Sequence, residues 1–208
     1  EVRFSRQVTD WRIEAGLLTG LTVNGGLIVD CSVALLGIGL STRDTYKQLQ
    51  RLGVAMEAKP FSIGVRIEHP QELIDRSQYG AAAGHPVLGA ADYSLVYHDR
   101  LAGRTAYSFC MCPGGMVIGA VSESGGVVVN GMSHYNRASG LANSALAVNV
   151  TPDDFGGGVL DGVEFQRHYE RKAFEIAGRS YFAPMQTVGG FLHNQTSATK
   201  LVQPSYGP

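Results

Sequence analysis

The sequence carries two cysteines, Cys110 and Cys112, that lie one residue apart and directly before Pro113-Gly114. Proline followed by glycine is typical of a type II turn, whose exposed backbone amides can activate a nearby thiol. The pair could be a redox dithiol, half of a metal site, a wall of a cofactor pocket or buried packing. Packing or pocket lining is the simplest interpretation. A metal site is the weakest, because no histidine has ligand spacing with the pair.

A second group of chemically capable side chains is the sequence Arg66-Ile-Glu68-His69, which places three titratable groups within four residues. The alternating pattern of 61–68 predicts a strand on which Arg66 and Glu68 face the same side. An ion pair at the surface is the commoner outcome for such neighbours. The functional interpretation is that Arg66 and His69 orient or protonate a substrate, and that Glu68 contacts it.

The segment 130–143 gathers directional hydrogen-bonding side chains around two glycines. Loops of this composition often serve as turns and caps. The same density also suits a pocket that fixes the orientation of a ligand. Under the second interpretation, the candidate substrate-binding residues of this segment are Asn130, Ser133, Arg137 and Asn143.

The bulk properties narrow the class of protein. The chain has 208 residues, of which 44% are hydrophobic and 17% charged, and its formal net charge is −1. Lysines and arginines are scattered, so we expect no nucleic-acid partner. The longest apolar run, at 33–40, is too short to cross a bilayer, and we expect no membrane partner. Three cysteines make no disulfide framework, which predicts a reducing, cytoplasmic setting.

The first 58 residues predict a sheet followed by a helix. Residues 1–30 alternate as a β-meander, and 32–39 form a continuous apolar run typical of a strand buried on both faces. The residues after this run fit a helix start of the capping-box type. Small residues before a helix N-terminus suit a phosphate or the edge of an electron-rich ring, although a capped helix after a tight turn is the plainer interpretation.

From residue 59 the pattern changes, so we place a domain boundary there, giving domains of 1–58 and 59–208. The second domain predicts a mixed sheet with a few helices, and the whole chain is expected to be α+β. No Gly-x-Gly-x-x-Gly motif opens a strand-helix unit. The expected strands are 61–68, 93–98, 104–110, 115–121, 126–129 and 147–150, and the expected helices are 70–74, 138–147 and 162–177.

Several strings of this sequence resemble one protein family. They are RIEHPQ (66–71), YSFCMCPGG (107–115), NGMS (130–133) and ANSAL (142–146). The family is that of bacterial uncharacterised FAD-dependent dehydrogenases, within the wider glutathione-reductase-like flavoprotein superfamily. The resemblance extends from the meander to about Phe191.

The resemblance implies that the chain is the middle portion of a longer flavoprotein. Residues 1–58 would then belong to an FAD-binding domain, and 59–208 would form an inserted, substrate-side domain. The strand-end motif implies FAD contacts for four residues. It departs from the family at Leu40, where a histidine is expected. The implied FAD-binding residues are Gly37, Gly39, Ser41 and Arg43.

The leading hypothesis is therefore the substrate-side portion of an FAD-dependent oxidoreductase with a small-molecule substrate and NAD(P)H as a possible co-substrate. We expect these 208 residues to be inactive without the FAD-binding remainder of the longer chain. Cys110, Cys112, His69 and Arg66 are the candidate catalytic residues. The alternative is a non-catalytic binding or interaction domain with a structural cysteine pair. A thiol enzyme without flavin is disfavoured, since no histidine is placed by sequence to activate either cysteine.

Overall fold

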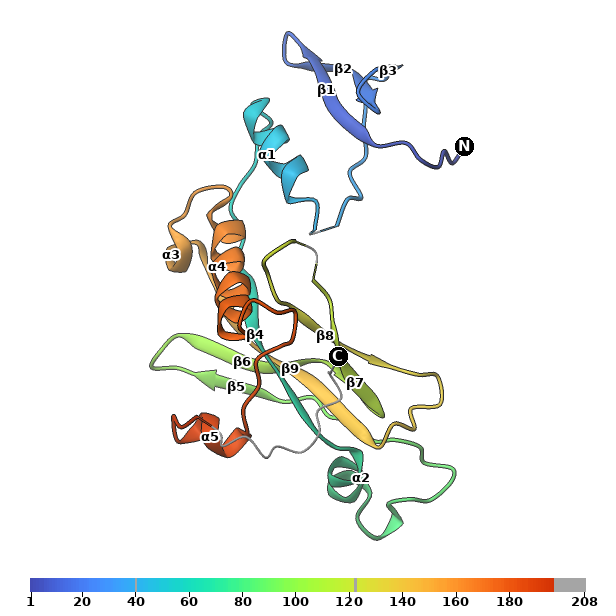
Figure 1. Cartoon of the computed structure of the whole chain (residues 1–208), viewed down its shortest axis with the longest axis vertical. Helices are drawn as coiled ribbons and strands as arrows, with labels where there is room; N and C mark the ends of the chain where they lie inside the picture. The colour runs from blue at the N-terminus through green and yellow to red at the C-terminus, as the bar shows by residue number, and fades with distance from the viewer. Residues whose placement is uncertain (40, 122, 197–208) are drawn as a thin grey trace. The chain divides into compact units, whose positions relative to one another are not determined.

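The computed structural model of the chain describes residues 1–39, 41–121 and 123–196 (Figure 1). The chain divides into two compact units, Glu1–Glu57 and Ala58–Pro208, which are described separately below. Helices and antiparallel sheets occur together, so the expected α+β class is confirmed. Within the described residues, no helix is long and apolar enough to cross a bilayer.

The first unit contains the predicted meander and the predicted helix. Its three antiparallel strands lie in the order β1-β2-β3. Asn24 and Gly25 turn the chain between the last two strands with positive φ values of 50° and 73°, which asparagine and glycine tolerate best. The elements are β1 (Val8–Glu14), β2 (Leu17–Val23), β3 (Leu27–Asp30) and α1 (Arg43–Arg51).

The predicted buried strand at 32–39 is wrong. This segment forms no strand, and the side chains of Val33 and Leu35 are 83% and 99% exposed. A strand buried on both faces needs neighbouring strands and covering layers. In the described part of the first unit, the sheet pairs β1, β2 and β3 and leaves the apolar run outside.

The second unit is built on a four-stranded antiparallel sheet in the order β4-β9-β6-β5, with a separate hairpin of β7 and β8. The predicted helix at 138–147 is wrong, because most of it lies in β9, between β4 and β6. Pairing along both edges outweighs the helix preference of its alanines. The strands are β4 (Phe61–Pro70), β5 (Val96–Asp99), β6 (Arg104–Cys112), β7 (Gly115–Gly119), β8 (Val129–Ser133) and β9 (Leu141–Val150).

The predicted amphipathic helix at 162–177 is confirmed as α4. Its start is anchored by aromatic packing, since the Phe61 ring lies 5.4 Å from that of Phe155 and 6.2 Å from that of Phe165. These contacts connect the first residue of β4 to the two helices that follow β9. The helical elements of this unit are α2 (Gln71–Tyr79), η1 (Gly80–Ala82), α3 (Pro152–Phe155), α4 (Asp161–Ile176) and α5 (Val188–Leu192).

Candidate functional site

Strand register gathers several of the predicted site residues at one end of the sheet. Glu68 lies opposite Asn143, and Asn143 lies opposite Cys112 on the other neighbouring strand. Antiparallel partners share a face of the sheet, and so do residues two apart on one strand. Arg66, Glu68, Asn143 and Cys112 therefore lie on one face, and the predicted common side of Arg66 and Glu68 is confirmed.

Arg66 is the centre of this face. Its guanidinium donates to Asn143 Oδ1, to Asn130 Oδ1 at 3.2 Å and to the Cys110 carbonyl at 3.3 and 3.4 Å. In the described part of the chain, every oxygen that the Arg66 guanidinium contacts is neutral. The predicted ion pair with Glu68 is absent from these described contacts. We call Arg66, Asn130, Asn143 and the Cys110 carbonyl the Arg66 cluster.

A β-bulge in β6 brings the Cys110 carbonyl to the cluster. The register with β9 shifts between Phe109 and Cys112, so Cys110 is left out of the ladder. Cys110 has a φ of 45°, a left-handed conformation that side-chain-bearing residues rarely adopt. The Cys110 carbonyl accepts one hydrogen bond from each of Nη1 and Nη2 of Arg66, and a weaker one from Cys112 Sγ at 3.4 Å.

The hairpin strand β8 closes over the cluster at Gly131. A Cβ at this position would collide with Asn143 Oδ1 and Arg66 Nη1, so only glycine fits without a shift. Asn143 is fully buried, with 0% exposure, and its Nδ2 has no hydrogen-bond partner. Asn130, by contrast, is exposed and also accepts from the Gly131 amide at 2.8 Å. The Arg66 guanidinium thus packs against the buried Gly131 and Asn143, and it also contacts the exposed Asn130.

The opposite face of the same sheet end carries a second polar group. His69 Nε2 lies 3.0 Å from the Tyr93 hydroxyl. Burial raises the pKa of Tyr93, while a hydrogen bond with Ser144 and the charge of Arg66 act in the lowering direction. Ser144 is fully buried. His69 and the Tyr93 hydroxyl thus form a hydrogen-bonded pair, whereas the Ser144 hydroxyl donates to the carbonyls of Phe109 and Ala145.

Two further residues hold the loops around the site. Glu68 Oε2 accepts a hydrogen bond from the Val117 amide at 3.3 Å, which ties β7 to β4. Gln71 is 6% exposed, and its Oε1 accepts from the Gly114 amide at 2.7 Å. Gln71 Nε2 donates to Ala91 O at 2.9 Å, so one side chain joins the turn after the cysteines to the segment before Tyr93.

Neither Tyr93 nor Gln71 was predicted as a site residue, although Gln71 ends the RIEHPQ string. Their partners are 24 and 43 positions away, and no local spacing marks such contacts. Of the predicted residues, Ser133 and Arg137 are exposed and lie outside the Arg66 cluster. A predicted role for those two in substrate binding remains a prediction.

Both thiols at the edge of the site are free and reachable. Cys110 is exposed and Cys112 is partly buried. No group of three or more His, Cys, Asp or Glu residues among the described positions could hold a metal ion. Thiol chemistry and pocket lining both remain predictions for Cys110 and Cys112.

The predicted FAD-binding residues lie in the first unit, before and at the start of α1. Gly39 has a φ of 68°, and a Cβ at Gly37 or Gly39 would meet nothing within 4 Å, so this backbone is open to a ligand. Ser41 is exposed, whereas Arg43 is 2% exposed and so presents little surface. Leu40 lies outside the described residues. The role of these residues in FAD binding remains a prediction.

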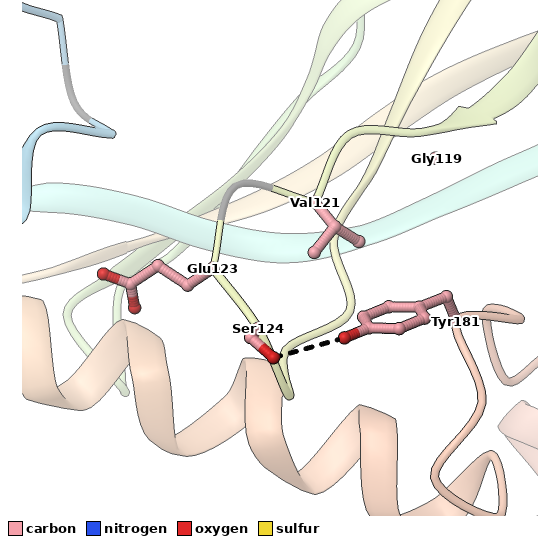
Figure 2. Close-up of a pocket in the computed structure, with 5 residues that line it drawn as sticks. All are labelled: Gly119, Val121, Glu123, Ser124 and Tyr181. Carbon is pink, nitrogen blue, oxygen red and sulfur yellow. Dashed lines mark hydrogen bonds between the residues drawn. The ribbon is translucent and has the colours of Figure 1, made fainter.

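A cavity of about 440 Å³ lies between the loop after β7 and the residues that follow α4 (Figure 2). The Tyr181 hydroxyl lies 3.5 Å from Ser124 Oγ and accepts a hydrogen bond from the Gly125 amide at 3.3 Å. The hydrogen bonds from Ser124 and Gly125 lower the pKa of Tyr181. The residues that line this cavity are Gly119, Val121, Glu123, Ser124 and Tyr181.

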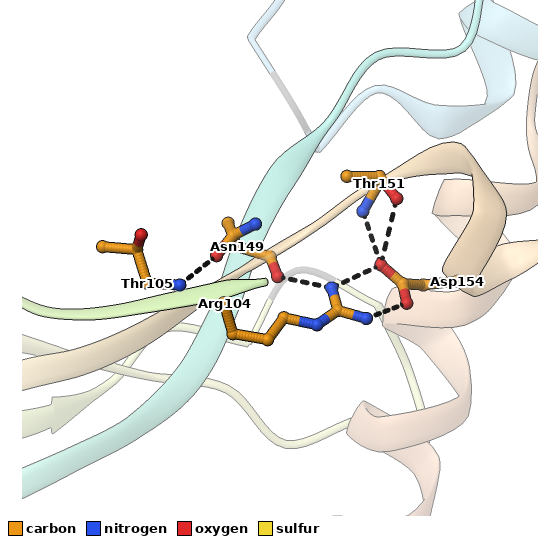
Figure 3. Close-up of polar contacts among 5 residues, drawn as sticks. All are labelled: Arg104, Thr105, Asn149, Thr151 and Asp154. Carbon is orange, nitrogen blue, oxygen red and sulfur yellow. Dashed lines mark hydrogen bonds and ion pairs between the residues drawn. The ribbon is translucent and has the colours of Figure 1, made fainter. Parts of the chain in front are cut away.

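A charged contact at the other end of the sheet is structural (Figure 3). Arg104 donates with two nitrogens to the Asp154 carboxylate, and also to Asn149 O at 3.0 Å. Asp154 completes a capping box with Thr151 at the start of α3. The hydrogen bonds from Arg104 hold the pKa of Asp154 below its usual range. This contact fastens β6 and α3 together.

Comparison with known proteins places the chain in a family. Residues 60–208 match the family described as "FAD-dependent protein, C-terminal domain-like", and the chain belongs to it. A relative from Clostridium beijerinckii, described as an uncharacterized protein, is 52% identical over 209 residues. The match covers 99% of this chain and 39% of that protein, so the chain spans about two fifths of its relative's length. The expected FAD-dependent family is thereby confirmed.

Proposed function

We propose that this chain is the substrate-side part of an FAD-dependent oxidoreductase, a dehydrogenase of the glutathione-reductase-like superfamily that works in the cytoplasm. In this proposal 1–58 belongs to the FAD-binding domain and 59–208 is the inserted domain. The family match over 60–208 supports the flavin. The observation that carries the proposal is the Arg66 guanidinium, a fixed positive charge whose described partners are all neutral oxygens.

Arg66 would orient the substrate. A cation that is not paired with a carboxylate can attract an anionic ligand. This attraction is stronger in a partly buried site than in water, because the local dielectric constant is lower. Neutral acceptors on three sides hold the guanidinium in place before any substrate arrives. This arrangement suits a small molecule with a carboxylate or with an oxygen that gains negative charge as it reacts. Asn130, exposed beside Arg66, supplies a further polar contact.

His69 and Tyr93 would move the proton that accompanies hydride transfer. When bound, the flavin supplies hydride exchange with the organic substrate or with NAD(P)H. In the described geometry, the Tyr93 hydroxyl lies within hydrogen-bonding distance of His69 Nε2, so a proton can pass between them. The raised pKa of Tyr93 keeps its hydroxyl protonated and able to donate.

The test uses an extended protein, meaning this chain joined to the segments that its relative carries beyond it. We expect the extended protein to purify with bound flavin, and this chain alone to bind little or none. The absence of flavin from the extended protein would contradict the proposal. A visible absorbance spectrum of each purified sample, before and after denaturation, gives the flavin content.

A double substitution tests whether the thiols take part in redox chemistry. It also helps to distinguish the oxidoreductase from the non-catalytic alternative. Replacement of Cys110 and Cys112 by serine in the extended protein removes both thiols and changes one side-chain atom, from sulfur to oxygen, at each position. Slower flavin reduction by NADH or NADPH, with unchanged flavin content, would assign the thiols a redox role. Unchanged reduction would leave them as packing. An extended protein that holds flavin but exchanges no electrons with any reductant would favour the binding domain.

A further inference from the structure

A second concave surface lies over the last two turns of α4, beside the loop between β7 and β8. Its cavity has a volume of about 290 Å³ and adjoins the Tyr181 cavity of Figure 2, because Ser124 lines both. It belongs entirely to the second unit and is separate from the Arg66 cluster. The residues that line it are Ser124, Gly125, Arg171, Phe174, Glu175 and Arg179.

The side chains that line this cavity carry a net positive charge. In the part of the chain that the structure describes, the side chains of Arg171 and Arg179 make no ion pair and no hydrogen bond. Glu175 is the single acid in the lining, so two cations face one anion. Arg167, one turn earlier, shows the contrast: Glu123 and Glu164 hold it at 2.7 and 2.5 Å. These two carboxylates are thus paired with Arg167.

The backbone fixes Arg179 beside the cavity. Gly178 and Arg179 have φ values of 69° and 60°, and the second is unusual for a residue with a side chain. The Arg179 amide donates to Phe174 O at 2.9 Å, and the Gly178 amide to Glu175 O at 3.0 Å. This left-handed cap closes the carbonyl end of α4, which would otherwise repel an anion. The end of the helix is therefore occupied by its own backbone, while the guanidinium stays free to bind.

We propose that this cavity is an anion site that takes a phosphate group, either as free phosphate or as a phosphate ester. Arg171 and Arg179 would donate to its oxygens, since guanidinium groups match phosphate geometry. The neighbouring rings of Phe174 and Tyr181, with centroids 5.2 Å apart, would contact the organic part of an ester. This site does not depend on the flavin chemistry proposed above.

Isothermal titration calorimetry of the 208-residue chain tests the proposal with three probes: inorganic phosphate, 5′-AMP and adenosine. We expect both phosphates to bind and adenosine not to bind. Tighter binding of 5′-AMP would identify an ester as the ligand, and equal binding would identify free phosphate. Arg171→Gln and Arg179→Asn should each weaken binding roughly tenfold, the loss expected for one charge-assisted hydrogen bond. Asparagine is used because it tolerates the left-handed backbone.

Lys172→Gln is the matched control, because it removes the same charge from the next position of α4, outside the lining of the cavity. It should leave phosphate binding within about twofold, since exposed charges at a distance are screened. Circular dichroism melts confirm that all variants are folded. No binding of either phosphate at millimolar concentration, or an equal loss in Lys172→Gln and Arg171→Gln, would overturn the proposal.

Discussion

Asn143 is the most informative position for testing how the Arg66 cluster is held together. Its Oδ1 accepts from the Arg66 guanidinium, whereas its Nδ2 is buried and has no partner. The two halves of this amide therefore contribute differently to stability. Asn143→Ala removes the accepting oxygen, and Asn143→Asp keeps that oxygen while it replaces the unpartnered nitrogen.

The expected magnitudes follow from these contacts. A hydrogen bond from a charged donor contributes about 1.5–3 kcal/mol, so Asn143→Ala should lower the free energy of unfolding by about 2–3 kcal/mol. Asn143→Asp loses no hydrogen bond, and its carboxylate lies against Arg66. The attraction to Arg66 and the cost of burying the new charge oppose each other. The Asp variant should therefore lie within about 1 kcal/mol of the wild type near neutral pH.

Urea denaturation followed by circular dichroism measures both variants. Asn130→Ala is the control, because Asn130 is exposed and its bond to Arg66 is the longer one, at 3.2 Å. We expect it to cost about 1 kcal/mol or less. Two results would refute the reasoning: Asn143→Ala within about 0.5 kcal/mol of the wild type, or Asn143→Asp less stable than Asn143→Ala.

Three further predictions concern other parts of the second unit. The pKa of Asp154 is lowered in the folded chain by Arg104, so its stabilisation is present above the unfolded value of about 3.9 and disappears as the pH falls. Asp154→Asn should therefore lower the thermal midpoint near pH 6, and its difference from the wild type should shrink steadily as the pH falls below about 4. A difference that does not change with pH would show that the carboxylate is not paired as described. Gly114→Ala should cost about 3 kcal/mol, because its φ is 56° and its Cβ would overlap a backbone carbonyl; denaturation at wild-type urea concentrations would contradict this. Ultraviolet titration should show Tyr181 ionising below the usual tyrosine range, and Ser124→Ala should raise that pKa; an unchanged titration would oppose it.

The sequence alone predicted several residues of the site, but it did not predict which of them contact one another. Arg66 and Glu68 share a face because strand periodicity is local, and that much follows from the pattern of 61–68. The contact between Arg66 and Asn143 spans 77 positions and depends on the register of β4 with β9. Register is set by pairing along whole strands, which a single motif does not show.

The two wrong elements have a common physical origin. The run at 32–39 is apolar enough for a buried strand, and 138–147 has helix-forming alanines. Each prediction used local preference, and each outcome was decided by the presence or absence of neighbouring strands. Residues 141–150 form β9, which pairs with β4 on one edge and β6 on the other. Residues 32–39 pair with no strand in the described first unit. Tertiary context overrides propensity in both directions.

The rate of flavin reduction in the extended protein tests the proposed role of Arg66 most directly. Arg66→Gln removes the positive charge and keeps hydrogen-bond donors, Arg66→Lys keeps the charge, and Arg76→Gln changes an exposed arginine paired with Glu72. Stopped-flow measurements with NADH and NADPH should show a loss of at least tenfold for Arg66→Gln, partial retention for Arg66→Lys and wild-type rates for Arg76→Gln, all with full flavin content. A flavin-loaded Arg66→Gln protein that is reduced at the wild-type rate would contradict the account.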